Sequence, residues 1–274
     1  MSDYQCIRVE TIAPALGAVI HEVDCRANLS GRVIEEIRKA WLQHLVVFFP
    51  NQNLEPAEQL AFARRFGVPV EYPMVQGMIG FPEVVQVVKL PHEAHNFGGI
   101  WHSDTTYLEQ PPIGALLLAR ELPPVGGDTL FANMYLAYDA LSEGMKTLLD
   151  KLIVVQSSAK AGAARSREDR LSDESTVVKQ ALEAEHPAVR THPETGRKVL
   201  FVNYGHSVRF KDMAEAESKP VLDYLFAHQT RPEFTCRFQW SVGSMAMWDN
   251  RCTQHNPIND YHGFKRVMHR ISIN

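Results

Sequence analysis

Short apolar runs of strand length dominate the C-terminal part of the chain, and helices do not separate them regularly. The last of these runs occupy residues 234–240, 244–250 and 266–273. A parallel doubly wound sheet needs a helix between successive strands, so this order argues against one. We predict a mainly β fold with added helices, in the form of a double-stranded β-helix, or jelly roll.

The rest of the chain adds further strands and a few helical patterns. Apolar runs predict strands at 45–49, 84–89, 113–120 and 199–203. Helical spacing of apolar residues predicts helices at 30–44, 56–66, 142–152 and 219–229. Ser30, Ser142 and Ser218 stand where they can cap three of these helices. Gly67 suits the end of the second helix, and Pro220 is tolerated in the first turn of the last.

The size and composition of the chain predict one large domain. It has 274 residues, 45% of them hydrophobic, which is enough for a sizeable core. No repeat or low-complexity linker divides it, so we predict a single domain over residues 1–274. Residues 157–185 are polar, which predicts a lid or a solvated insertion within that domain. The sequence leaves open whether the native C-terminus extends past Asn274.

Charge and cysteine content argue against several classes of protein. The formal net charge is −4, and Lys and Arg form no long runs, so nothing indicates nucleic-acid binding. The start MSDYQCIRVE lacks the pattern of a signal peptide, and no window approaches 18 apolar residues, so we expect no membrane span. Cys6, Cys25, Cys236 and Cys252 are far apart, which indicates reduced thiols in a cytoplasmic protein.

The most informative local motif is Trp101-His102-Ser103-Asp104. On an extended segment, residues two apart point to the same side, so His102 and Asp104 can offer an imidazole and a carboxylate to one ion. A third ligand is available in His255, which follows an apolar strand in the segment WDNRCTQHNP. Two histidines and one carboxylate on one face of an ion are typical of non-haem Fe(II) oxygenases. We therefore predict His102, Asp104 and His255 as iron ligands and as the catalytic centre.

Two arginines after His255 support this interpretation, because a His-x-Asp motif alone is far more often a surface or core pair. Arg266 and Arg270 share one face of the strand predicted at 266–273. A buried guanidinium needs an anionic partner, and its planar shape suits a carboxylate. One arginine could anchor the far carboxylate of a dicarboxylate chelated to iron, and the other could bind the primary substrate or the near carboxylate. The competing interpretation is that both pair with structural Asp or Glu residues.

The spaced motifs HxD, GGDT, WDNR-x-x-x-H and R-x-x-x-R together resemble one family. This is the taurine dioxygenase / 2,4-dichlorophenoxyacetate dioxygenase family of Fe(II)/2-oxoglutarate enzymes. The resemblance extends from ALGAVIHEVD near the N-terminus to the C-terminal end. It implies a jelly roll, the cofactors Fe(II), 2-oxoglutarate and O2, and an oxidoreductase activity. The implied reaction hydroxylates a small organic substrate and releases succinate and CO2.

The resemblance also implies roles for individual residues. Thr129, in the GGDT segment, would place its hydroxyl on the 2-oxoglutarate carboxylate. Arg266 would make the main ion pair to that distal carboxylate, and Arg270 would reach the anionic group of the primary substrate or help to seat the co-substrate. Thr129 comes from the resemblance alone, because a glycine pair before a threonine is ordinarily just a turn.

The positions that would contact the substrate depart from the taurine-specific pattern. In taurine-specific members a His and a Tyr follow the Phe-Gly after the second helix, and an Asn lies shortly before HxD. Here those positions hold Tyr72, Val75 and Gly98, and His206 replaces the usual aromatic. We therefore expect a sulfonate, a sulfate ester, or an aryloxy or other carboxylate rather than taurine. The candidates for the substrate pocket are Tyr72, Phe97, Gly98, Thr105, Tyr107, His206 and Arg270. Most of these side chains could instead serve in packing.

Two other classes of protein compete with this interpretation. A cupin-like metal hydrolase or isomerase would share the fold, but it would not need arginines at the spacing of Arg266 and Arg270. A binding or sensor protein would be expected to lose a ligand of the set, which is intact here. We expect Trp248 and Asp249 to help to position His255. As partners we expect a small anionic substrate and, from the resemblance, a second copy of the chain in a homodimer or homotetramer, with no nucleic acid or membrane.

Overall fold

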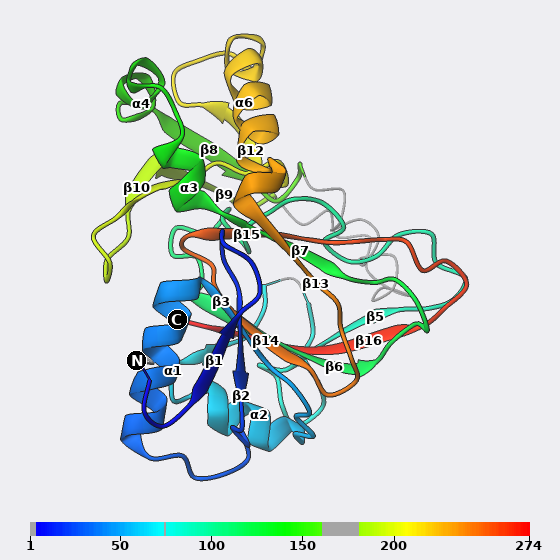
Figure 1. Ribbon diagram of the computed structural model, residues 1–274. Helices are drawn as coiled ribbons and strands as arrows, with labels where there is room; N and C mark the ends of the chain where they lie inside the picture. Colours follow the sequence, from blue (N-terminus) through cyan, green and yellow to red (C-terminus); the bar gives the residue numbers. More distant parts are fainter. Residues whose placement is uncertain (1–3, 74, 161–180) are drawn as a thin grey trace.

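Figure 1 shows the computed structural model, which describes residues 4–73, 75–160 and 181–274. Its largest element is an 8-stranded sheet in the order β1-β2-β3-β14-β6-β16-β4, with β5 paired to β16. The strands are β1 (Arg8–Thr11), β2 (Ala18–His21), β3 (Val46–Phe49), β4 (Pro69–Val70), β5 (Val85–Lys89), β6 (Gly114–Glu121), β14 (Met245–Asp249) and β16 (Arg266–Ile273). All their pairings are antiparallel except that of β2 with β3.

A second, smaller sheet lies over part of the first. It has the order β13-β7-β15 and consists of β13 (Thr235–Phe238), β7 (Thr129–Asn133) and β15 (Thr253–Pro257). The chain crosses from the large to the small sheet between β6 and β7, and after the elements of a further layer it alternates between the two sheets through β13, β14, β15 and β16. Two facing antiparallel sheets connected in this way make the predicted jelly roll.

A further layer covers the small sheet, at the top of Figure 1. It contains a three-stranded sheet in the order β12-β8-β9, a β10-β11 hairpin, three helices and the 3-10 turn η1 (Pro232–Phe234). The elements are α3 (Met134–Asp139), α4 (Glu143–Leu149), β8 (Ile153–Ser157), β9 (Glu183–Pro187), β10 (Val189–Thr191), β11 (Lys198–Leu200), β12 (Ser207–Phe210) and α6 (Glu215–Gln229). Most of the predicted lid, residues 161–180 of 157–185, lies outside the described residues, so both the lid and the single-domain boundary stay predictions.

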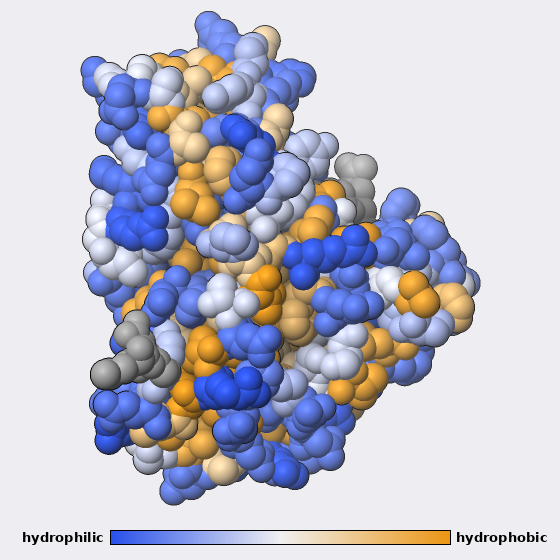
Figure 2. Space-filling model, viewed as in Figure 1, coloured by the Kyte–Doolittle hydropathy of each residue, from blue (hydrophilic) through white to orange (hydrophobic). Residues whose placement is uncertain are grey.

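Helices α1 (Gly31–His44) and α2 (Pro56–Ala63) pack against the other side of the large sheet. This burial on both faces explains the continuous apolar run of β3. Val46 and Phe48 join the core cluster between the sheets, whereas Val47 and Phe49 join the cluster under α1 and α2. Side chains alternate along a strand, so a strand covered on both faces has no polar positions. The face shown in Figure 2 has hydrophilic and hydrophobic residues interspersed.

The helices begin and end partly where the sequence predicted. Ser30 and Ser142 cap α1 and α4, as expected. Helix α2 ends at Ala63, before the predicted residue 66, and Gly67 serves a close approach instead. A Cβ at Gly67 would lie 2.6 Å from the carbonyl oxygen of Asn274. Helix α6 begins at Glu215, so Ser218 lies inside it and accepts a hydrogen bond from the Phe210 N–H at 2.9 Å.

Strand prediction succeeded for several apolar segments, but it missed others, such as β2 and β8, and it missed polar strands. The bounds of β16 are those predicted, whereas β11 ends at Leu200, before the predicted residue 203. Strands β7 and β15 were not predicted, and β15 reads TQHNP, which has no apolar alternation. In the described part of the chain no helix is both long and apolar enough to cross a membrane. All four cysteines are free, and only Cys6 is exposed.

Candidate active site

The backbones of His102 and His255 are joined directly. The His102 N–H donates to the His255 carbonyl at 3.1 Å, and the His255 N–H donates to the His102 carbonyl at 2.9 Å. His255 follows the apolar strand β14, as predicted, but it lies within a further strand, β15, and the HxD motif crosses beside it. His102 forms an isolated bridge, and Asp104 lies in the turn that follows. The extended part of the HxD motif is therefore shorter than predicted.

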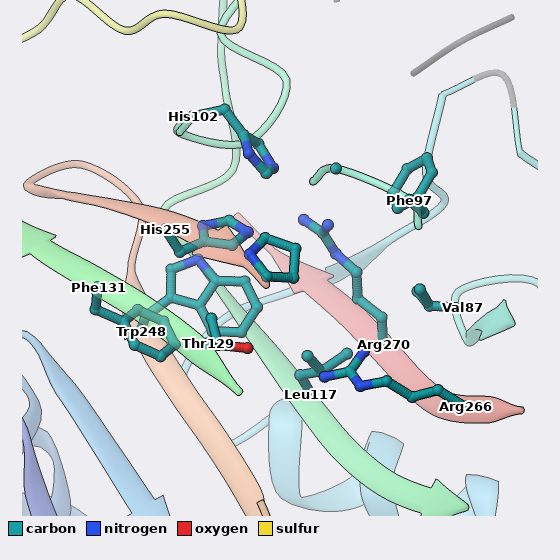
Figure 3. Close-up of a pocket in the computed structure, with 12 residues that line it drawn as sticks. Val87, Phe97, His102, Leu117, Thr129, Phe131, Trp248, His255, Arg266 and Arg270 are labelled. Carbon is teal, nitrogen blue, oxygen red and sulfur yellow. The ribbon is translucent and has the colours of Figure 1, made fainter. Parts of the chain in front are cut away.

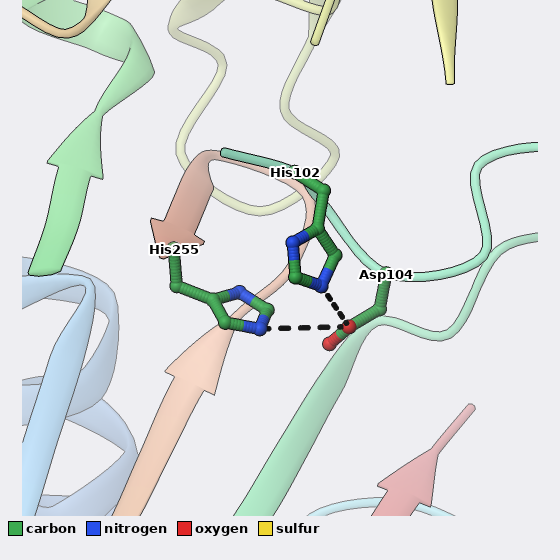
Figure 4. A group of neighbouring side chains, drawn as sticks. All are labelled: His102, Asp104 and His255. Atoms are coloured by element: carbon green, nitrogen blue, oxygen red, sulfur yellow. Dashed lines mark ion pairs between the residues drawn. The ribbon is translucent and has the colours of Figure 1, made fainter. Parts of the chain in front are cut away.

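The side chains of His102, Asp104 and His255 converge on one point (Figure 4). The Oδ1 atom of Asp104 lies 3.5 Å from Nε2 of His102 and 3.7 Å from Nε2 of His255. All three residues are buried, and Asp104 is fully so. The sequence prediction that these residues come together is therefore confirmed at the level of geometry.

The protonation of the three groups suits metal binding. Nδ1 of His102 lies 2.7 Å from the Ile100 carbonyl, to which it can donate, and this leaves the lone pair on Nε2 free. Burial and the neighbouring His102 lower the pKa of His255 well below its usual value, so its ring is neutral at pH 7. Burial by itself raises the pKa of Asp104, but the guanidinium of Arg270 and the two histidine rings hold it well below 3.8.

These residues fit a divalent metal such as Fe(II). Although fully buried, Oδ1 of Asp104 has no hydrogen-bond partner among the described residues. A buried carboxylate oxygen without a partner is costly, and a cation at the meeting point of the triad would satisfy it. Two imidazoles and one carboxylate leave further coordination positions open, as Fe(II) oxygenases require.

A cavity between the two sheets opens from the triad. In Figure 3, the rings of His102 and His255 lie in its upper part and the guanidinium of Arg266 in its lower part. Both sheets contribute, with Thr129 on β7 and Arg266 on β16. The lining residues are Val87, Phe97, Gly98, His102, Leu117, Thr129, Phe131, Trp248, His255, Pro257, Arg266 and Arg270.

Arg266 is a buried cation without an anion. Its side chain has no ion pair within 4.0 Å among the described residues, and Nε and Nη2 lack hydrogen-bond partners. Only 4% of the residue is exposed. Burial lowers the pKa of its guanidinium, because a charge removed from water without an anionic partner is unfavourable. This argues against the alternative that Arg266 pairs with a structural acid.

Thr129 is held with its hydroxyl proton free. Its Oγ1 accepts a hydrogen bond from the indole N–H of Trp240 at 3.0 Å, and the residue is buried. Because that contact uses a lone pair, the hydroxyl can donate its own proton to an anion. Trp240 was not anticipated from the sequence, where no spacing links it to Thr129.

Arg270 pairs with a triad residue in this structure. Its Nη2 lies 2.7 Å from Oδ2 of Asp104, which also accepts from the Trp248 indole at 3.2 Å. The guanidinium lies 4.9 Å from the ring centroid of Tyr72, and it lines the cavity. Arg270 thus has an acidic partner, but that partner is Asp104 of the triad, and the predicted contact of Arg270 with the substrate stays a prediction.

The remaining predicted substrate residues divide into two groups. Phe97 and Gly98 line the cavity, and a Cβ on Gly98 would lie 3.0 Å from Cε1 of His102. A side chain at residue 98, such as the Asn expected in taurine-specific members, would press on the ligand ring. The others are not among the residues that line this cavity. His206 packs edge-on against His102 and Tyr107, with ring centroids 6.1 Å and 5.0 Å away.

Thr105 and Tyr107 belong to the second group, which does not line the cavity. Thr105 has a φ of 47°, which a β-branched residue rarely adopts, and its buried hydroxyl has no partner among the described residues. Such strain directly after Asp104 is typical of a functional site. Burial raises the pKa of Tyr107, and burial lowers that of His206 to about 3, so both are neutral.

Comparison with known proteins identifies the family. A family model described as taurine catabolism dioxygenase TauD, TfdA family matches residues 8–272. The chain belongs to the TauD/TfdA family. It is 34% identical to the alpha-ketoglutarate-dependent sulfate ester dioxygenase of Pseudomonas putida, over 97% of this chain and 88% of that protein.

Two further similarities extend over nearly the whole chain. The (S)-phenoxypropionate/alpha-ketoglutarate-dioxygenase of Sphingobium herbicidovorans is 32% identical over 94% of this chain and 92% of that protein. The crystal structure of a taurine dioxygenase from Burkholderia xenovorans matches with a TM-score of 0.83 at 33% identity, over 98% of this chain and 89% of that one. The jelly-roll prediction is thereby confirmed.

As a TauD/TfdA family member, the protein is a 2-oxoglutarate-dependent dioxygenase. It is an oxidoreductase that uses Fe(II), 2-oxoglutarate and O2. The resemblance seen in the sequence is confirmed, and the alternatives of a metal hydrolase, an isomerase or a non-enzymatic sensor are wrong.

The TauD/TfdA fold positions Asp104 through a residue that sequence reasoning missed. Asn250 accepts from the Asp104 N–H at 2.7 Å and donates to the Asp104 carbonyl at 3.0 Å. Trp248 packs against His255 as predicted, with ring centroids 4.8 Å apart. Asp249 does not help to position His255, because its carboxylate pairs with His192 and Arg251 on the other side of the strand.

Proposed function

We propose that His102, Asp104 and His255 hold the iron, and that Thr129 and Arg266 hold the distal carboxylate of 2-oxoglutarate. The observation that carries this proposal is the pairing of two unsatisfied groups in one site. Within the described residues, Oδ1 of Asp104 has no hydrogen-bond partner, and Arg266 has no acidic partner for its Nε and Nη2. A dicarboxylate that reaches from the metal to Arg266 would satisfy both ends of the cavity.

The iron, when bound, supplies the oxidising chemistry that decarboxylates 2-oxoglutarate and hydroxylates the substrate. The residues of this chain bind and orient the reactants. His255 keeps a neutral ring, Asp104 keeps its charge, and the contact of His102 Nδ1 with the Ile100 carbonyl directs Nε2 of His102 to the metal, so all three can act as ligands. Thr129 donates a hydrogen bond to the distal carboxylate, and Arg266 forms an ion pair with it. Together they fix one end of the co-substrate.

For the primary substrate we propose a small organic anion. The candidate classes are a sulfonate, a sulfate ester, and an aryloxy or other carboxylate, and taurine is not expected. Similarity to a sulfate ester dioxygenase and to a phenoxypropionate dioxygenase supports this range. Arg270 is the proposed anion contact, since it lines the cavity and its Nε has no hydrogen-bond partner among the described residues.

The same proposal covers the surroundings of this site. Tyr72, Phe97, Gly98, Thr105, Tyr107 and His206 would shape the substrate pocket. Gly98 leaves space where a longer side chain would approach His102.

We also propose a cytoplasmic homodimer or homotetramer that needs neither membrane nor nucleic acid, with a lid within residues 157–185.

A substrate panel tests this proposal. The protein is incubated with Fe(II), ascorbate, 2-oxoglutarate and alkyl sulfates, alkanesulfonates or aryloxyalkanoates, and succinate and O2 uptake are measured. We expect stoichiometric succinate with at least one anionic class and little with taurine. If only neutral compounds stimulated turnover, the role given to Arg270 would be wrong.

A further inference from the structure

Beside Arg266, the structure buries a second cation for which the proposed function has no role. Lys89 is the last residue of β5 and is only 2% exposed. Its Nζ has no hydrogen-bond partner, and among the described residues it has no ion pair within 4.0 Å. A buried lysine is rare unless it is paired, because removing its charge from water costs several kcal/mol.

Lys89 and Arg266 are immediate neighbours. They stand directly opposite each other in the antiparallel pairing of β5 with β16, which puts both side chains on the same face of the sheet. That face is the one toward the cavity, because Val87, two residues before Lys89, lines it. Both cations also approach one ring, that of Tyr261, with Nζ of Lys89 at 4.6 Å and Cζ of Arg266 at 6.0 Å from its centroid.

The acidic side chains nearby are committed elsewhere. Asp128 lies 2.7 Å from Nε of Arg237, and Asp260 accepts a hydrogen bond from the Gly127 N–H at 2.7 Å. Glu121 pairs with the exposed Lys265 at 2.8 Å. Two buried like charges on opposite residues repel each other and destabilise the fold. An anion that enters from the cavity would offset this cost.

We propose that Lys89 is a second cationic contact for the distal carboxylate of 2-oxoglutarate, beside Arg266. A carboxylate has two oxygens and can accept from several donors at once. Arg266, Lys89 and the hydroxyl of Thr129 together would give it three donors. This inference rests on the proposed role of Arg266, and it adds a determinant that favours a 2-oxo acid with a second carboxylate over one without.

The test compares two 2-oxo acids that differ only at the distal end. Under anaerobic conditions, the Fe(II) protein is titrated with 2-oxoglutarate and with 2-oxopentanoate, which ends in a methyl group. Binding is followed by the visible charge-transfer band of the chelate, so the readout is affinity rather than turnover. Lys89→Met should weaken the binding of 2-oxoglutarate about 10- to 100-fold, which is the effect of losing one charged hydrogen bond. It should leave the affinity for 2-oxopentanoate within about twofold of wild type.

Lys265→Met is the matched control. It removes a charge of the same sign next to Arg266, but Lys265 is half exposed and pairs with Glu121. Solvent and salt screen such a charge, so 2-oxoglutarate affinity should change by less than about twofold. In addition, metal-free Lys89→Met should melt at a higher temperature than wild type, because an unpaired buried charge is gone. A purely structural lysine would give the opposite shift.

Each result decides between the two proposals. If wild type gives no band with 2-oxoglutarate, the proposed site itself fails. If wild type binds and Lys89→Met binds 2-oxoglutarate equally well, only the inference about Lys89 is overturned. Lys89→Gln provides a second, polar variant. Loss of 2-oxopentanoate binding in both variants would show a structural role for Lys89 and would also overturn the inference.

Discussion

Two buried groups of ligand-type side chains exist in the part of the chain that the structure describes, and they behave differently. One is His102, Asp104 and His255, and the other consists of His192, Asp249 and Cys252. In each group the ligand atoms lie within 4.8 Å of one another, and all six residues are buried. Residue type, spacing and burial therefore do not distinguish a metal centre from a structural cluster here.

The difference lies in how the polar atoms are satisfied. Both oxygens of Asp249 accept from Arg251, with Nε at 2.8 Å from Oδ1 and Nη2 at 2.6 Å from Oδ2. Nδ1 of His192 accepts from backbone N–H groups, so its Nε2 carries the proton that goes to Asp249 at 3.0 Å. Asp249 and His192 therefore have no lone pair left for a cation. In the first group, Oδ1 of Asp104 and Nε2 of His102 remain available.

The largest effect should come from Asp104→Ala. Without its carboxylate the triad loses its charged ligand, so Fe(II) binding and coupled succinate formation should fall to background. The metal content is measured after gel filtration, and succinate is measured with the best substrate of the panel. Asp249→Asn, the matched change in the other group, should still bind one iron per chain. Full coupled turnover by Asp104→Ala would show that the metal assignment is wrong.

Arg251→Met should have the largest effect on stability. It leaves the Asp249 carboxylate buried without its main partner, which costs about 3–5 kcal/mol of unfolding free energy. Arg251 and His192 lower the pKa of Asp249 although burial raises it, so the pair stabilises the fold above pH 3.8 and the benefit is lost as the pH falls through the lowered value. Urea unfolding at several pH values should show the difference from wild type shrinking toward and below pH 3.8. A difference that does not depend on pH would argue against this pairing.

Added metal should stabilise the folded protein only by binding to the group of His102, Asp104 and His255. Mn(II) at about 100 times its dissociation constant should raise the unfolding free energy of wild type by about 2.7 kcal/mol. His192→Ala should show the same increase from its lower starting point, and Asp104→Ala should show none. Thermal melts with and without Mn(II), after treatment with a chelator, measure this. An increase that disappears in His192→Ala would exchange the roles of the two groups.

Cys252→Ala should have the smallest effect. Burial raises the pKa of the Cys252 thiol well above 9.0, so the sulfur is protonated and is a poor ligand. Removing it should cost about 1 kcal/mol and leave the iron content unchanged. Denaturant unfolding and metal analysis measure both quantities. A loss of iron would mean that the second group binds metal after all.

The sequence predicted best what apolar patterning or motif spacing determines. Strand β16 was predicted with its exact bounds, since its apolar residues alternate with Arg266 and Arg270. The triad was found because His102 and Asp104 lie two apart and His255 completes a set of known type. Thr129 depended on family resemblance, and its partner Trp240 could not be found, because their contact is made only when β7 meets the segment after β13.

Patterning could not predict polar strands or the partners of buried charges. Strand β15 has no apolar alternation, so it was not predicted, and His255 was expected only to follow the apolar strand before it. Asp249 was expected to support His255, but successive residues of β14 face opposite sides, and Asp249 meets His192 instead. The burial of Lys89 could not be predicted, because Lys89 ends an apolar strand, where a lysine is ordinarily exposed.

The mutual hydrogen bonds between the backbones of His102 and His255 have a kinetic consequence. If His102 and His255 hold the iron as proposed, their backbones cannot separate unless this bridge opens. We therefore expect a local opening of the fold to contribute to the release of the ion. Amide hydrogen exchange at His102 and His255 should slow together when metal is bound, and metal exchange should share the temperature dependence of that opening.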